Sequence, residues 1–77
     1  MPTVAKIGGL KVQVFADDHY PKHFHIVGPD FEVVVAMSDL SILKGRTYHR
    51  EIAEAMEWAG ENLDFLLEEW ARLNDDR

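Results

Sequence analysis

Two runs of β-forming residues flank a proline turn in the segment 23–37, which reads HFHIVGPDFEVVVAM. Side chains alternate across a strand, so a two-residue loop at Pro29-Asp30 fixes which residues of the two runs lie opposite each other. The opposed pairs in this register are Phe24 and Val35, Ile26 and Val33, His25 and Val34, His23 and Ala36, and Val27 and Glu32. The segment therefore predicts an antiparallel hairpin with one apolar face, and both histidines lie on the other face.

The sequence on either side predicts further strands of the same sheet. β-Branched and apolar residues over 3–7, a Gly8-Gly9 turn and an alternating segment over 10–15 are typical of a second hairpin. Residues 16–22 are polar and predict a loop, and the short apolar segment 40–43 is a candidate for a brief strand. We expect a small antiparallel sheet of about three to four strands in the N-terminal half.

Helical periodicity begins near Thr47, a suitable N-cap, with Glu51 in the first turn, where the helix dipole favours a carboxylate. Apolar residues then recur every three or four positions in one stripe, which comprises Ile52, Met56, Ala59, Leu63, Leu66, Trp70 and Leu73. One helix over 47–74 would be about 42 Å long, far longer than the strands that it covers. A break at Gly60-Glu61-Asn62, with Asn62 as a second N-cap, would shorten it. We predict an α+β fold in which one long or one broken C-terminal helix packs on the sheet.

At 77 residues the chain is too short for two independent cores, which indicates a single domain over 1–77. It contains no cysteine, so disulfides, thiolate metal sites and thiol nucleophiles are excluded. The longest apolar run, 33–37, is far shorter than the roughly 18 residues of a membrane span, and the first residues lack the pattern of a secretion signal. We expect a cytoplasmic protein that has no membrane partner.

Charge is distributed unevenly along the chain. Residues 1–50 contain six Lys and Arg against five Asp and Glu, whereas residues 51–77 contain two against nine. The acidic C-terminal segment repels phosphate backbones, so general nucleic-acid binding is disfavoured. A local contact with RNA stays open through the basic residues Lys11, Lys22, Arg46 and Arg50.

The segment 19–25, which reads HYPKHFH, contains three of the four histidines. His23 and His25 point to the same side of the predicted strand, and His19 lies on the preceding loop, so the three rings could converge. As neutral ligands, alone or with Asp17 or Asp18, these imidazoles would suit Zn²⁺ or a similar divalent ion. His19, His23 and His25 are therefore candidate metal ligands, and a divalent metal is the candidate cofactor.

Two other interpretations of the histidines stay open. A pair of them could act as general acid and base in phosphodiester cleavage, with Arg46 at the phosphate, which makes His19, His23, His25 and Arg46 the candidate catalytic residues. Alternatively, strand histidines that only hydrogen-bond to loop carbonyls would have a structural role and no chemistry.

Trp58 and Phe65 are seven residues apart and lie opposite the apolar stripe of the predicted helix. A bend that buries both helix faces would explain them, and so would a partner that covers the second face. Carboxylates on the same segment, at positions 51, 54, 57, 61, 64 and 68, form a solvated face that could also meet a basic partner. Trp58 and Phe65 are the candidate partner-binding residues.

Four segments of the sequence together resemble one protein family. They are the opening MPTVAKIGGL over 1–10, the D-H-x-P-x-H-x-H block over 18–25, the Gly45-Arg46 step, and the ending from W-A to L-L-x-x-W over 58–70. The family that they resemble is the domain-of-unknown-function family numbered 4160. The resemblance implies a small bacterial protein often encoded beside another short protein, in an arrangement like a toxin–antitoxin pair. The family block often has a second proline where this chain has Lys22.

The leading hypothesis is therefore a small protein of a toxin–antitoxin-like module that binds a small partner protein encoded by an adjacent gene. Its histidine cluster is the candidate functional site. The alternatives are a histidine-based ribonuclease toxin, a metal-binding module without turnover, and a purely structural antitoxin-type binder.

Overall fold

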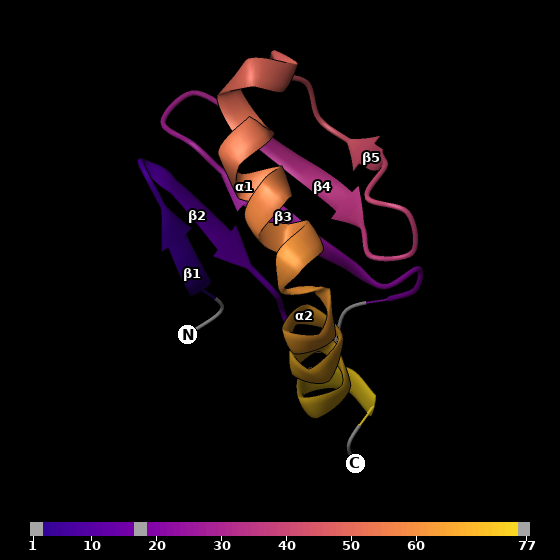
Figure 1. The fold of residues 1–77 in the computed structure, drawn as a ribbon. Helices are drawn as coiled ribbons and strands as arrows, with labels where there is room; N and C mark the ends of the chain where they lie inside the picture. The colour runs from indigo at the N-terminus through magenta and orange to yellow at the C-terminus, as the bar shows by residue number, and fades with distance from the viewer. Residues whose placement is uncertain (1–2, 17–18, 76–77) are drawn as a thin grey trace.

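The computed structural model describes residues 3–16 and 19–75, which form a five-stranded antiparallel sheet covered on one face by two helices (Figure 1). The strands are β1 (Thr3–Ile7), β2 (Leu10–Gln13), β3 (His23–Val27), β4 (Glu32–Ala36) and β5 (Ile42–Lys44). They pair in chain order, so β1 and β5 form the two edges. The helices are α1 (His49–Glu61) and α2 (Leu63–Trp70), followed by a π-helical turn, η1 (Ala71–Asp75). The predicted α+β class is confirmed.

The central hairpin, β3–β4, has the register predicted from the sequence in all five opposed pairs. The Gly28 amide donates a hydrogen bond to the Phe31 carbonyl at 2.9 Å, which closes the turn around Pro29-Asp30. The apolar face of the hairpin is fully buried and consists of Phe24, Ile26, Val33 and Val35. The other face carries the histidines, as the alternation required.

The sheet has five strands in the described residues, instead of the three to four expected, and the fifth lies at 42–44 instead of 40–43. Leu40 adopts a φ of +60°, in the left-handed region that a strand does not use. The Ser41 amide donates a hydrogen bond to Asp39 Oδ1 at 3.0 Å, so this segment is a turn. β5 can begin only after that turn.

The C-terminal helical segment is broken at Asn62, which decides between the two alternatives left open by the sequence. Asn62 has a φ of −122° and a ψ of 27°, and its Nδ2 donates a hydrogen bond to the Trp58 carbonyl at 2.9 Å. It occupies the N-cap position of α2, as predicted for a broken helix, but its side chain is turned back to α1. The N-cap of α1 is Tyr48, so the assignment to Thr47 is wrong; Glu51 lies in the first turn as predicted.

The helices extend past the ends of the strands, and the loop after β2 packs against the overhanging part (Figure 1). The Phe15 carbonyl accepts a hydrogen bond from Asn74 Nδ2 at 3.0 Å, and the Tyr20 ring stacks on the Trp70 ring at 5.9 Å. β2 therefore ends at Gln13 instead of residue 15, because the chain leaves the sheet to reach the end of the helix. The part of the helical segment that extends past the strands is therefore covered by this loop and not by the sheet.

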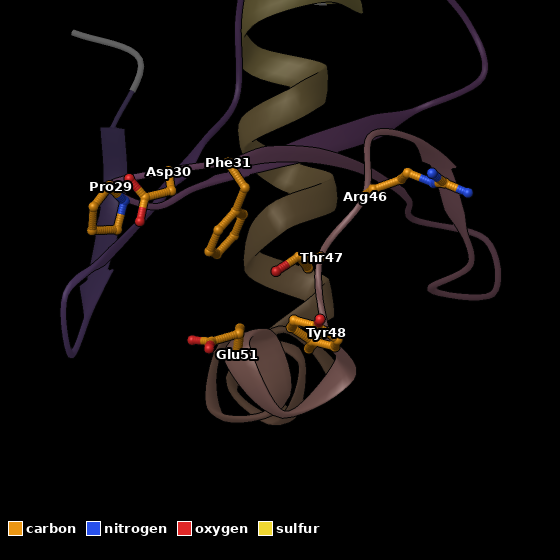
Figure 2. Close-up of a pocket in the computed structure, with 7 residues that line it drawn as sticks. All are labelled: Pro29, Asp30, Phe31, Arg46, Thr47, Tyr48 and Glu51. Carbon is orange, nitrogen blue, oxygen red and sulfur yellow. The ribbon is translucent and has the colours of Figure 1, made fainter.

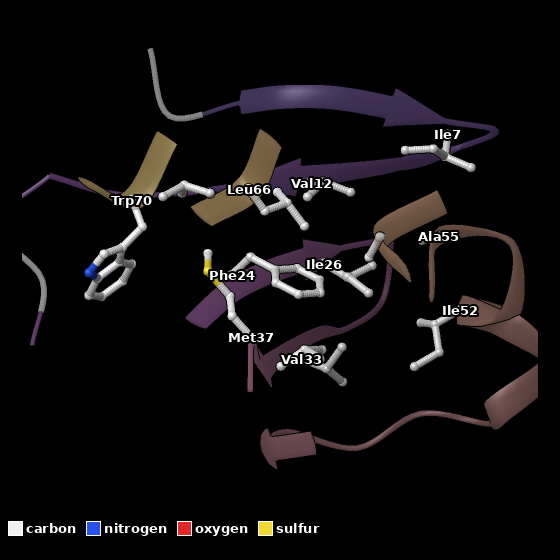
Figure 3. Packing of buried hydrophobic residues seen from close by; sticks show 13 residues of the cluster. Ile7, Val12, Phe24, Ile26, Val33, Met37, Ile52, Ala55, Leu66 and Trp70 are labelled. Atoms are coloured by element: carbon white, nitrogen blue, oxygen red, sulfur yellow. The ribbon is translucent and has the colours of Figure 1, made fainter. Parts of the chain in front are cut away.

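The hydrophobic core lies between the helices and the covered face of the sheet (Figure 3). Its fully buried side chains include Val12, Phe24, Ile26, Val33, Ile52, Leu66 and Trp70. Both α1 and α2 contribute to it, so the break at Asn62 lets the two helices pack on the same layer. Neither helix in residues 3–16 and 19–75 combines the length and the apolar composition that a membrane crossing requires.

Candidate functional site

The three histidines predicted to converge lie close together at the start of β3. The ring centroids of His19 and His23 are 6.0 Å apart, and those of His23 and His25 are 5.4 Å apart. Alternation along β3 puts His23 and His25 on the same face of the strand, and the loop that enters β3 brings His19 alongside. We refer to these three residues as the histidine cluster.

Hydrogen bonds fix the tautomers of two rings in this cluster. His23 Nδ1 lies 2.7 Å from the Pro21 carbonyl oxygen, and His25 Nδ1 lies 2.7 Å from Glu32 Oε2. A carbonyl or an ionised carboxylate only accepts, so Nδ1 carries the proton and donates in both cases. Each neutral ring then keeps its lone pair on Nε2, the arrangement of a general base or of a histidine that ligates a metal through Nε2.

Glu32 is a member of this site that the sequence analysis missed. The predicted register nevertheless contained the signal, because it places Glu32 two residues from Val34, the direct neighbour of His25. Such diagonal positions are within reach of long side chains on one sheet face. A search of the diagonal neighbours of each histidine would have found this contact.

Two of the three histidines are largely covered, although they lie on the face opposite the apolar side of the hairpin. His19 is exposed, but His23 is only 7% exposed, and the His25 side chain is 16% exposed. The His23 ring lies 5.1 Å from the Trp70 ring, and the His25 ring lies 4.7 Å from Phe15 in an edge-to-face arrangement. Because α2 extends past the ends of the strands, Trp70 can contact His23 at the start of β3. The cluster thus joins the β2–β3 loop, β3 and α2.

Within residues 3–16 and 19–75, no group of three or more His, Asp or Glu side chains is placed to hold a metal ion. Asp17 and Asp18, the further ligands considered in the metal hypothesis, lie outside the described residues. Hydrogen bonds and aromatic packing are sufficient to explain the positions of the His23 and His25 rings. A zinc site at the cluster stays a prediction.

Arg46, expected at the phosphate in the catalytic hypothesis, is far from the histidines. It follows β5 and lines a groove of about 600 Å³ between the β3–β4 turn and the start of α1, and its guanidinium points away from the other lining side chains (Figure 2). This groove lies at the end of β4 that begins with Glu32, whereas His23 pairs with Ala36 at the other end. The two ends are roughly 13 Å apart along the strand.

Trp58 and Phe65, the predicted partner-binding residues, contact each other across the helix break. Their rings meet edge to face, with centroids 6.3 Å apart. Trp58 is partly buried against the core, whereas Phe65 is 38% exposed, so the bend at Asn62 buries this pair only in part. We call the surface formed by the pair and its acidic neighbours Glu54, Glu57, Glu61, Asp64 and Glu68 the aromatic–acidic face.

A protein-family model matches residues 9–71, which run from the β1–β2 turn to the end of α2 and include both the histidine cluster and the Trp58–Phe65 pair. The model describes a domain of unknown function, DUF4160. The chain belongs to the DUF4160 family. No curated protein and no solved structure matched this DUF4160 chain.

Proposed function

We propose that this DUF4160 protein binds a small partner protein, in a toxin–antitoxin-like module, through its aromatic–acidic face. The observation that carries the proposal is Phe65, which is 38% exposed although it belongs to an aromatic pair on a helix. Exposed aromatic side chains with a polar surround are typical of protein interfaces, where they supply much of the binding energy. We also propose the cytoplasm as its compartment, with which the absence of cysteine agrees.

The histidine cluster has a positioning role in this proposal. Trp70, at the end of α2, contacts the rings of both His23 and Tyr20, with centroid distances of 5.1 and 5.9 Å. Phe15 connects the same loop to η1 through its hydrogen bond with Asn74. These contacts hold α2 against the loop and thereby fix the orientation of Phe65, which lies on the same helix.

Co-expression with the product of the adjacent gene tests the proposal. We expect the two proteins to co-purify from a tagged DUF4160 chain and to elute together in size-exclusion chromatography. The variant Phe65→Ala should lose the complex, whereas Tyr48→Ala, which removes a 71% exposed aromatic ring at the N-cap of α1, should keep it. A complex that survives Phe65→Ala would refute the proposed face. Growth arrest and rescue in the same cells would show which of the two proteins is toxic.

A second candidate function is phosphodiester cleavage, which is favoured by the hydrogen bonds that leave Nε2 of His23 and His25 as the basic atom. RNA cleavage should then be lost in His23→Ala and in His25→Ala but retained in His49→Ala, where the ring is exposed at the start of α1. The melting temperature of each variant shows whether a loss of cleavage reflects lost chemistry or lost folding, and cleavage that persists in the first two variants would eliminate this function.

A further inference from the structure

A groove of about 360 Å³ adjoins Trp58, between α1 and the β1–β2 turn. Residues 6–8 form its sheet side, and its helix side consists of Glu54, Glu57, Trp58 and Glu61. The groove is therefore a concave site with one aromatic wall and a rim of carboxylates. Trp58 also contacts Phe65, so one side chain belongs both to the groove and to the aromatic pair of the aromatic–acidic face.

Three glutamates line this groove against one lysine, Lys6, so its described lining is acidic. Among the described residues, Glu54, Glu57 and Glu61 make no ion pair within 4.0 Å, although Lys6 lines the same groove. Glutamates three and four residues apart on a helix face repel one another, which destabilises the helix slightly. Binding of a cation would remove this repulsion, so the free protein favours a positively charged occupant.

We propose that this groove receives an arginine side chain from a basic, amphipathic helix of the partner protein; this inference rests on the proposed function. A guanidinium can stack on the Trp58 indole while it donates paired hydrogen bonds to a flanking carboxylate of Glu54 or Glu61. Phe65 then contacts an apolar side chain of the same partner helix. Side chains four residues apart on a helix are separated by about 6 Å, close to the 6.3 Å between the two aromatic rings.

The negative charge of the aromatic–acidic face also favours a basic helix over a second copy of this chain as the occupant. The segment that carries the face, residues 51–77, contains nine Asp and Glu against two Lys and Arg. Two such faces would repel each other, whereas a basic helix is complementary to either of them. The partner segment is therefore rich in Arg and Lys, with apolar residues on the side that meets Phe65.

A designed peptide tests the inference on the intact protein. The probe is a helical peptide of about 20 residues in which each Arg is followed four residues later by Leu, and the control peptide has Glu in place of Arg. Isothermal titration calorimetry should detect binding of the Arg peptide only. The double variant Glu54→Gln/Glu61→Gln should weaken this binding at least roughly tenfold, the effect of losing charge-assisted hydrogen bonds. Glu51→Gln, on the other groove, is the matched control and should change the affinity little.

Equal affinity for the two peptides, or equal losses in the double variant and in Glu51→Gln, would overturn the inference. The product of the adjacent gene separates this failure from that of the proposed function. If that protein binds in a manner sensitive to Phe65→Ala but insensitive to Glu54→Gln/Glu61→Gln, the arginine groove is wrong and the face is right. If it does not bind while the Arg peptide does, the groove stands and the proposed partner is wrong.

Discussion

Phe65 and Leu66 are neighbours in α2 with opposite surroundings, and replacing each by alanine tests the orientation of this helix. Leu66 is fully buried, so Leu66→Ala removes a core side chain and leaves a cavity, at a cost of about 2–5 kcal/mol. Phe65 is 38% exposed, so only about three-fifths of its burial energy is lost, roughly 1.5 kcal/mol. The better helix propensity of Ala returns about 0.5 kcal/mol, which leaves a net cost near 1 kcal/mol.

Urea and thermal unfolding followed by circular dichroism measure both variants. A chain of this size has a free energy of unfolding of roughly 4–11 kcal/mol, and each kcal/mol lost lowers the melting temperature by about 4–8 °C. We expect Leu66→Ala to lower the melting temperature by at least about 10 °C, and Phe65→Ala to lower it by less than half as much. Equal losses in the two variants would mean that Phe65 is buried within the monomer, which would refute the exposed aromatic face.

Three further predictions concern the sheet and the C-terminal turn. Gly45→Ala should cost at least about 2 kcal/mol in urea unfolding, because Gly45 has a φ of +93° and an added Cβ would lie 2.3 Å from the Glu32 carbonyl oxygen; an unchanged midpoint would contradict this contact. In ¹H–¹⁵N spectra of the wild type, neutral His25 should show the Nδ1–H tautomer, and Glu32→Ala should mix the tautomers; an Nε2–H form in the wild type would exclude the hydrogen bond. Hydrogen bonding to Arg72 lowers the pKa of Glu69, so this pair stabilises the fold above the ordinary carboxyl pKa and its contribution is lost as the pH falls through the lowered one. Arg72→Met should raise the Glu69 pKa measured by NMR and change stability by less than about 0.5 kcal/mol, because the pair is at the surface; an unmoved pKa would rule the pair out.

The central hairpin could be predicted from the sequence because two constraints agree there. Period-two alternation assigns Phe24 and Ile26 to one face, and the short turn at Pro29-Asp30 sets the pairing, so the register followed and is confirmed. Strand ends were harder to predict. Leu40 takes a left-handed conformation that is unusual for a residue other than glycine, and nothing in the local sequence signals it.

The arrangement of the candidate site was likewise predictable from the sequence only in part. Convergence of the histidines followed from spacing along one strand, whereas the covering of His23 by Trp70 depends on a contact between residues 47 positions apart (70 minus 23). Arg46 was expected near the histidines because both are typical of phosphate chemistry, but the strand order carries it to the other end of β4. Local patterns therefore predicted which residues share a face, and only the three-dimensional fold determines which elements meet at their ends.

The two tryptophans provide the most direct test of the proposed docking face, since Trp58 lies on that face and Trp70 is fully buried beside the histidine cluster. Their two indole N–H resonances can be followed in ¹H–¹⁵N correlation spectra while the product of the adjacent gene is titrated into the labelled protein. We expect the Trp58 resonance to shift or broaden in proportion to complex formation and the Trp70 resonance to stay in place. A complex that moves the Trp70 resonance and leaves that of Trp58 unchanged would refute the docking face and place the partner at the histidine cluster.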